Sequence, residues 1–233
     1  MSASTYQTAL IVGAGQGLSA SLARLLAKTG MRMALASRSP ADLADLAGET
    51  GAKVFACDAS IDNQVARLFT DVDAVMGSPD VVIYNASFRT RGDFIDLVPV
   101  DVEKAIAVSA FGAFLVAQQA ARRMLPNKHG ALLFTGASAS VKGYAKSAPF
   151  AMAKFALRGL SQSLARELQP HGIHVAHFVI DGGILSDRRP EPADKPDSLL
   201  DPDAIAQTYL DVLRQPRNAW TSEVELRPWV ETF

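Results

Sequence analysis

Short apolar runs alternate with longer helical stretches along almost the whole chain, and this alternation limits the possible folds more than any other feature. Runs typical of strands occur at 8–12, 31–36, 53–57, 80–85, 131–135, 174–180 and 223–226. Stretches typical of helices lie between them, at 18–27, 40–49, 61–76, 100–125, 149–168 and 201–213. Repeated strand–helix units predict a parallel sheet with helices on both faces, which is a doubly wound α/β fold of about seven strands.

The length and composition of the chain fit one domain of this kind. The chain has 233 residues, 48% of them hydrophobic, which is ample for one core. The 23 basic and 24 acidic residues give a net charge of −1, which argues against a nucleic-acid partner. We therefore expect residues 1–233 to form a single domain. The proline-rich stretch 186–200 lacks periodicity, and we expect it to be a flexible flap over the substrate.

Other classes of protein are disfavoured. The single cysteine, Cys57, excludes an intramolecular disulfide and a cysteine-rich zinc site, and the four histidines show no metal-ligand spacing, so we expect no metal. The longest uncharged stretch, 105–121, is too short and too polar for a bilayer helix. The first eight residues lack the pattern of a secretion signal. We therefore expect a cytoplasmic protein that does not bind membranes.

The turn after the first strand has the composition of a phosphate-binding loop. Gly13, Gly15 and Gly17 allow a tight turn and a close approach of the backbone to a phosphate. The helix that follows would add free N–H groups and the positive end of its dipole. The glycine spacing fits two phosphate-binding patterns incompletely, because Leu18 or Ser19 replaces the last glycine. The alternative is an ordinary turn between a strand and a helix.

Residues after the second and third strands bear on the choice of nucleotide. Where this fold binds NAD, an acidic residue usually follows the second strand, but Ser37 and Arg38 stand there instead. Arginine is suited to phosphate, so NADP(H) is favoured over NAD(H); a solvated arginine is the alternative. Asp58, after the third strand, would accept a hydrogen bond from an adenine amino group, unless it is an ordinary loop aspartate.

Taken in order, these motifs resemble those of the short-chain dehydrogenase/reductase family. The resemblance rests on the glycine turn, on Asp58 and on the segments 84–87, 150–154 and 181–186. It implies a Rossmann-type fold and hydride transfer between a nicotinamide and an alcohol or carbonyl of unknown identity. It also implies a homodimer or homotetramer paired through the two long helices.

Several residues of the long helices bear on this assembly. Small residues that would allow close helix packing are Ala113, Ala117, Ala153 and Ala156. Three nearby aromatic residues, Phe111, Phe114 and Phe134, are expected in the core.

The resemblance also implies roles for individual residues. Cofactor contacts are expected from Gly13, Gly15, Gln16, Gly17, Leu18, Ser37, Arg38, Asp58, Ala59, Asn85, Ala86, Lys154, Gly182, Ile184 and Ser186. The catalytic positions are Ser109, Ser138, Phe150 and Lys154. Tyr144, Asp181 and Gly183 are the candidates for substrate contacts.

The catalytic positions depart from the family pattern. Phe150 stands four residues before Lys154, where the family has its catalytic tyrosine, and has no hydroxyl. The serine position falls on Ala137, with Ser138 next to it, and the asparagine position falls on Ser109. Two main hypotheses follow: an oxidoreductase with an atypical active site, or a cofactor-binding pseudoenzyme that acts as a sensor or partner protein. A non-redox enzyme would depend on Asp181 alone.

Overall fold

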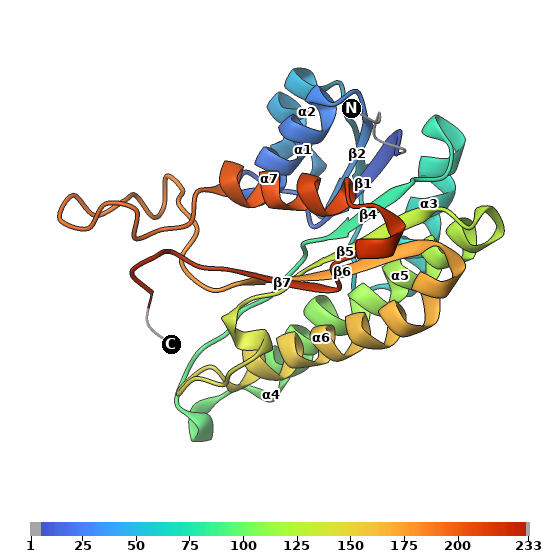
Figure 1. Ribbon diagram of the computed structural model, residues 1–233. Helices are drawn as coiled ribbons and strands as arrows, with labels where there is room; N and C mark the ends of the chain where they lie inside the picture. The colour runs from blue at the N-terminus through green and yellow to red at the C-terminus, as the bar shows by residue number, and fades with distance from the viewer. Residues whose placement is uncertain (1–5, 232–233) are drawn as a thin grey trace.

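Seven parallel strands form one sheet in the computed structural model, which describes residues 6–231 (Figure 1). The sheet order is β3-β2-β1-β4-β5-β6-β7. The strands are β1 (Thr8–Val12), β2 (Arg32–Ser37), β3 (Lys53–Ala56), β4 (Val81–Tyr84), β5 (Gly130–Thr135), β6 (Ile173–Ile180) and β7 (Glu223–Leu226). The order reverses between β1 and β4, and ligands of open α/β sheets bind at such a reversal, beside the carboxyl ends of the strands.

Helices cover both faces of this sheet, as the alternation in the sequence predicts. One face carries α1 (Leu18–Lys28), α2 (Ala44–Thr50) and α7 (Pro202–Leu213), and the other carries α3 (Asp62–Met76), α4 (Pro99–Ile106), α5 (Gly112–Met124) and α6 (Ala148–Leu168) (Figure 1). Consecutive strand residues therefore enter different cores: Ile11 packs in one and Leu10 in the other, both fully buried. Burial on both faces explains why central strands such as β1 and β4 are continuous apolar runs, whereas the edge strands β3 and β7 are partly exposed and include charged residues.

The long helix expected at 100–125 is interrupted. A π-helical turn, Ala107–Phe111, separates α4 from α5 and buries Ser109 completely. Such turns are frequent at functional sites. The expectation that Phe111 and Phe114 are core residues is wrong, because they are 49% and 42% exposed; Phe134 is buried as expected.

The small residues expected at a helix-pairing surface face inward instead. Ala113, Ala117 and Ala153 are buried within the protomer, where they allow the helices to pack closely on the sheet. The apolar side chains that α6 leaves exposed are Met152 and Phe155. The prediction that these small residues form the pairing surface is therefore wrong for the three buried alanines. Ala156 is exposed and could still lie on such a surface.

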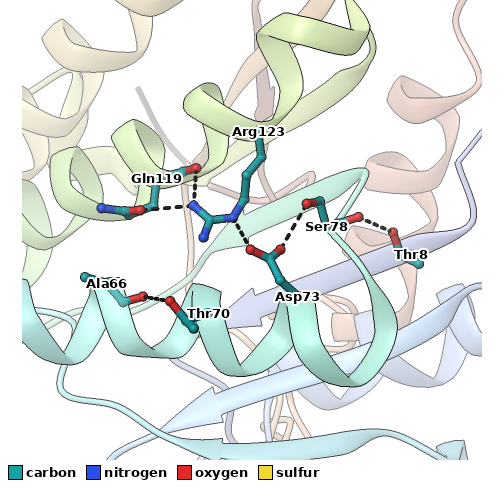
Figure 2. Close-up of polar contacts among 7 residues, drawn as sticks. All are labelled: Thr8, Ala66, Thr70, Asp73, Ser78, Gln119 and Arg123. Carbon is teal, nitrogen blue, oxygen red and sulfur yellow. Dashed lines mark hydrogen bonds and ion pairs between the residues drawn. The ribbon is translucent and has the colours of Figure 1, made fainter.

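A polar clasp joins α3 to α5 (Figure 2). Nε of Arg123 donates to Oδ2 of Asp73 at 2.7 Å, and its Nη1 donates to both the backbone and the side-chain oxygen of Gln119 at 3.0 Å. The hydroxyl of Ser78 donates a hydrogen bond to the carboxylate of Asp73. The backbone carbonyl of Ser78 accepts a hydrogen bond from the hydroxyl of Thr8 at the start of β1. The clasp therefore anchors both helices beside the amino ends of the strands, away from the carboxyl ends.

No helix within residues 6–231 is long and apolar enough to cross a membrane.

Candidate functional site

A cleft of about 420 Å³ opens at the carboxyl ends of the strands, where the sheet order reverses. Nine of the residues expected to contact a cofactor line it: Gly13, Gly15, Gln16, Ser37, Arg38, Asp58, Ala59, Asn85 and Ala86. Six others do not line it. Gly17 is exposed beside α1, and the side chain of Leu18 packs in the core. Lys154 is buried on α6, and three more line a second cavity: Gly182, Ile184 and Ser186. The fold thus brings most of the expected nucleotide residues into one cavity.

The glycine turn is shaped by two close approaches. The N–H groups of Gly13 and Ala14 both donate to the carbonyl of Ala36, which fixes the turn on β2. Gly13 has φ of +83°, and a Cβ there would overlap the backbone of Ala86. Only glycine fits that position without strain.

The rest of the turn faces open space. A Cβ at Gly15 or Gly17 would meet no other atom within 4 Å. The N–H groups of Gly15, Gln16 and Gly17 have no hydrogen-bond partner within residues 6–231. Unsatisfied N–H groups at the start of a helix form an anion site. This turn therefore has the donors and the space that a phosphate needs.

Asn85 connects the turn to the strand at the centre of the cleft. Its side-chain amide donates to Oγ of Ser19 at 2.6 Å, and Ser19 donates to the carbonyl of Gly13 at 3.2 Å. The backbone N–H of Asn85 donates to Val12. Asn85 thus holds β4 against the glycine turn.

At the far end of the cleft, Ser37 and Arg38 lie near Asp58. Oγ of Ser37 is buried and has no hydrogen-bond partner within the described residues. Arg38 is exposed and forms no ion pair with an acid there. Burial raises the pKa of Asp58, but hydrogen bonds from Ser60 and the charge of Arg38 outweigh it, so the pKa is lowered. This end combines an unused hydroxyl with an available guanidinium.

Asp42, which sequence reasoning missed, also lines the cleft.

A second cavity, of about 970 Å³, lies at the carboxyl ends of β5 and β6. Eight of the expected site residues line it: Ser138, Tyr144, Phe150, Asp181, Gly182, Gly183, Ile184 and Ser186. The residues expected to contact a substrate, and part of those expected to contact the cofactor, therefore share one space.

Lys154 and Phe150 lie one turn apart on α6. The Nζ atom of Lys154 donates to the carbonyl of Thr135 at 2.7 Å and lies 5.8 Å from the centre of the Phe150 ring. Lys154 is 3% exposed and lines neither cavity, and burial lowers its pKa to about 8. Phe150 lines the second cavity, and so does Thr135, whose carbonyl accepts the hydrogen bond from Lys154.

The remaining catalytic candidates differ in position. Ser138 begins a short helical turn after β5 and lines the second cavity. Tyr144 is 44% exposed and lines it too. Ser109 lines neither cavity: its hydroxyl is buried, accepts from the N–H of Phe88 at 3.1 Å and lies 3.5 Å from the Ser87 hydroxyl. Ser109 therefore supports the loop after β4.

Asp181 is a buried acid with two cationic partners. Its Oδ2 lies 3.0 Å from Arg227 and 3.3 Å from Lys142. The hydrogen bond to Asp181 raises the pKa of Lys142. Asp181 is thus at the carboxyl end of β6, where the sequence predicts it, but its charge is already compensated.

Four arginines in the second cavity were missed by sequence reasoning. Arg89 and Arg91 follow β4, and Arg188 and Arg189 follow β6. The available signal was their position, because both arginine pairs come after strands whose carboxyl ends face the site. Among residues 6–231, no group of three or more His, Cys, Asp or Glu side chains is placed to hold a metal ion.

The segment 186–200 projects from the body of the molecule as a long loop (Figure 1). Its base is held by a β-bridge between Ile184 and Leu200. Within the loop, one carboxylate oxygen of Glu191 accepts hydrogen bonds from the backbone N–H groups of Ser198 and Leu199. Its movement over the substrate stays a prediction.

Comparison with known proteins agrees with this geometry. The family described as short chain dehydrogenase matches residues 7–194. A short-chain dehydrogenase/reductase of Armillaria gallica is 31% identical over 187 residues, covering 76% of this chain and 71% of its own length.

Two solved structures resemble the whole chain. A short-chain dehydrogenase from Rhodopseudomonas palustris is 32% identical, with a TM-score of 0.82 over 96% of this chain and 99% of that one. A metagenomic short-chain oxidoreductase in complex with NADP is 27% identical, with a TM-score of 0.83 over 96% and 98%. With its sheet order, its glycine turn and these matches, the chain belongs to the short-chain dehydrogenase family.

Proposed function

We propose that this protein is an NADP(H)-preferring oxidoreductase that acts on a small alcohol or carbonyl and uses an atypical active site in which Phe150 stands at the tyrosine position. The observation that carries the proposal is the nucleotide cleft, where unpaired N–H groups lie at one end and the unpaired Ser37 hydroxyl lies beside Arg38 at the other. Membership of an oxidoreductase family supports the reaction class, and the NADP-bound relative supports the cofactor.

The residues of the cleft fit a dinucleotide. The glycine turn would hold the pyrophosphate, because its N–H groups are unpaired and the space before them is open. Ser37 and Arg38 would hold a 2′-phosphate, since both have donors to spare. Asp58 would accept a hydrogen bond from the adenine amino group. When bound, the nicotinamide supplies or accepts the hydride.

The protein side of the reaction lacks the usual proton donor. Reduction of a carbonyl needs a proton at the oxygen, and Phe150 has none to give. In this proposal the proton comes from water in the open cavity, and the hydroxyl of Ser138 orients the substrate oxygen. Lys154, beneath the Phe150 ring, contributes positive charge to this region when protonated.

The deciding experiment measures turnover with a panel of small carbonyls and alcohols by the absorbance of the reduced nicotinamide. We expect turnover about two to four orders of magnitude below that of an enzyme with a tyrosine donor. NADP(H) binding without turnover on any substrate would overturn the enzymatic proposal and favour a sensor or partner protein. Failure to bind either nucleotide would overturn both.

Replacement of Arg38 tests the cofactor preference. Arg38→Ala is expected to weaken NADP+ binding about tenfold or more, because a charge-assisted contact to the 2′-phosphate is lost, and to leave NAD+ binding unchanged. Calorimetric titration of both nucleotides measures this. Arg32→Ala, an exposed arginine at the other end of β2, is the matched control. Equal affinities for the two nucleotides in both variants would contradict the preference.

We also propose a homo-oligomer, a dimer or a tetramer, paired through α5 and α6. Four large apolar side chains on or next to these helices are between 42% and 52% exposed: Phe111, Phe114, Met152 and Phe155. Phe111 and Phe114 stack on each other, and an apolar patch of this kind marks a protein–protein contact. Light scattering is expected to give an oligomer at micromolar concentration, and Phe155→Glu is expected to shift it toward the monomer. Val75→Glu, on α3, controls for an added surface charge. A monomeric parent protein would refute the assembly.

A further inference from the structure

We propose that the second cavity binds its substrate by an anionic group, a carboxylate or a phosphate, which the guanidinium groups of Arg89 and Arg189 hold beside the Phe150 ring. This inference deepens the proposed function and rests on it, because the bound anion is a substrate only if the protein is an enzyme. The anion site itself rests on the placement of charged side chains around the cavity.

The cavity has an excess of positive charge. Arg89, Arg91, Arg188 and Arg189 all line it, and none forms an ion pair with an acid among residues 6–231. Arginine side chains that line a pocket without partners retain their full capacity for bidentate contacts with an oxyanion.

The other charged groups of the cavity do not cancel this excess. Lys146 is neutralised by Asp93 at 3.0 Å. Asp181 is engaged by Lys142 and Arg227, so it offers no charge to the arginines. Glu231 is the remaining acid in the lining, and one carboxylate cannot neutralise four guanidinium groups.

Arg89 lies on the catalytic side of the cavity. Its Cζ is 4.9 Å from the centre of the Phe150 ring, which is a cation–π contact that orients the guanidinium. Partial burial lowers the pKa of Arg89, and the charges of Arg91 and Arg189 lower it further. The arginines are therefore close enough to repel one another, and an anion placed between them would relieve that repulsion.

Arg189 is positioned by the backbone after β6. A Cβ at Gly183 would lie 2.7 Å from Nη1 of Arg189 and 2.9 Å from Leu199, so the glycine makes room for the arginine side chain. Arg189 also pairs with Ser186 through two backbone hydrogen bonds. Its position thus depends on the base of the 186–200 segment.

The test is anion binding by calorimetry, with inorganic phosphate and malonate as separate probes. Each titration is run on protein saturated with NADP+, so that the nucleotide cleft cannot bind the probe. We expect Arg89→Gln and Arg189→Gln each to weaken binding of the preferred probe about five- to tenfold, and the double variant to abolish it. Arg122→Gln, an exposed arginine on α5, is the matched control and is expected to bind like the parent.

The outcomes separate this inference from the proposed function. Binding of phosphate alone, or of malonate alone, identifies the anionic group. If NADP+ binds but neither probe does, or if the Arg122 variant loses as much affinity as the others, the anion site is wrong and the cofactor proposal stands. If NADP+ does not bind, the same probes are titrated without nucleotide, and a loss of affinity in the Arg89 and Arg189 variants that Arg38→Ala does not share supports the anion site without the proposed function.

Discussion

Replacement of Phe150 by tyrosine is expected to raise reductase activity toward simple activated ketones by about two to four orders of magnitude, which is the usual contribution of a general acid. The new hydroxyl would stand one helical turn from Lys154 and at the cavity that Phe150 already lines. Cations lie near the ring on two elements, with Lys154 at 5.8 Å and Arg89 at 4.9 Å from its centre. Positive charge lowers the pKa of a phenol, so the tyrosine would donate its proton more readily.

The control for this gain lies on the same helix. Phe155→Tyr adds a phenol at an exposed position of α6 and is expected to leave the activity unchanged. Adding Ala137→Ser is expected to raise the activity further, because in the proposed active site it places a hydroxyl where it can polarise the carbonyl. Initial rates with reduced nicotinamide measure both effects. A Phe150→Tyr variant that binds cofactor without gaining activity would mean that the pocket no longer presents a carbonyl to the nicotinamide.

Lys154 is expected to make the stability of the cofactor-free protein depend on pH. Burial lowers its pKa from 10.5 to about 8, so between these values the unfolded chain binds a proton that the folded chain does not. Stability therefore rises with pH across this window. The pKa shift corresponds to roughly 3 kcal/mol of unfolding free energy. The parent protein should gain about that much stability between pH 7 and pH 10.5, and Lys154→Met should not show this gain.

Urea unfolding of the parent and Lys154→Met at both pH values measures this difference. The tyrosines that titrate at high pH are common to both proteins and cancel in the comparison. Lys53→Met, an exposed lysine on β3, should show no such change relative to the parent. A stability difference that stays constant with pH would mean that water reaches the Lys154 ammonium in the folded protein.

The sequence predicted the fold well because both strands and helices are strongly patterned here. Strands buried on both faces are continuous apolar runs, and β1 and β7 have the predicted bounds. The π-helical turn at Ala107–Phe111 was not predictable from periodicity, since it adds one residue to a turn without changing composition. Phe111 and Phe114 were misplaced because an exposed aromatic residue looks like a core residue when no partner is known.

The part of the site that directly follows strand ends was predicted from the sequence, and the part that lies in irregular loops was not. The glycine turn, Ser37 and Arg38 follow strand ends directly, and the topology alone brings them together. The four arginines of the second cavity belong to loops without periodicity, and their convergence depends on how those loops fold back. Sequence position identified Asp181 as unusual but could not show that Arg227 and Lys142 already compensate it.

The parallel order of the sheet makes the two halves of this site modular. The nucleotide cleft is built mainly from the loops after β1, β2 and β3, whereas the arginines come from the loops after β4 and β6. Each loop leaves and re-enters the same scaffold, which the clasp between α3 and α5 anchors at its other end. Exchange of residues 187–200, which include Arg188 and Arg189, between homologues is therefore expected to alter the choice of substrate without touching the nucleotide cleft, which offers a direct route by which such chains diversify.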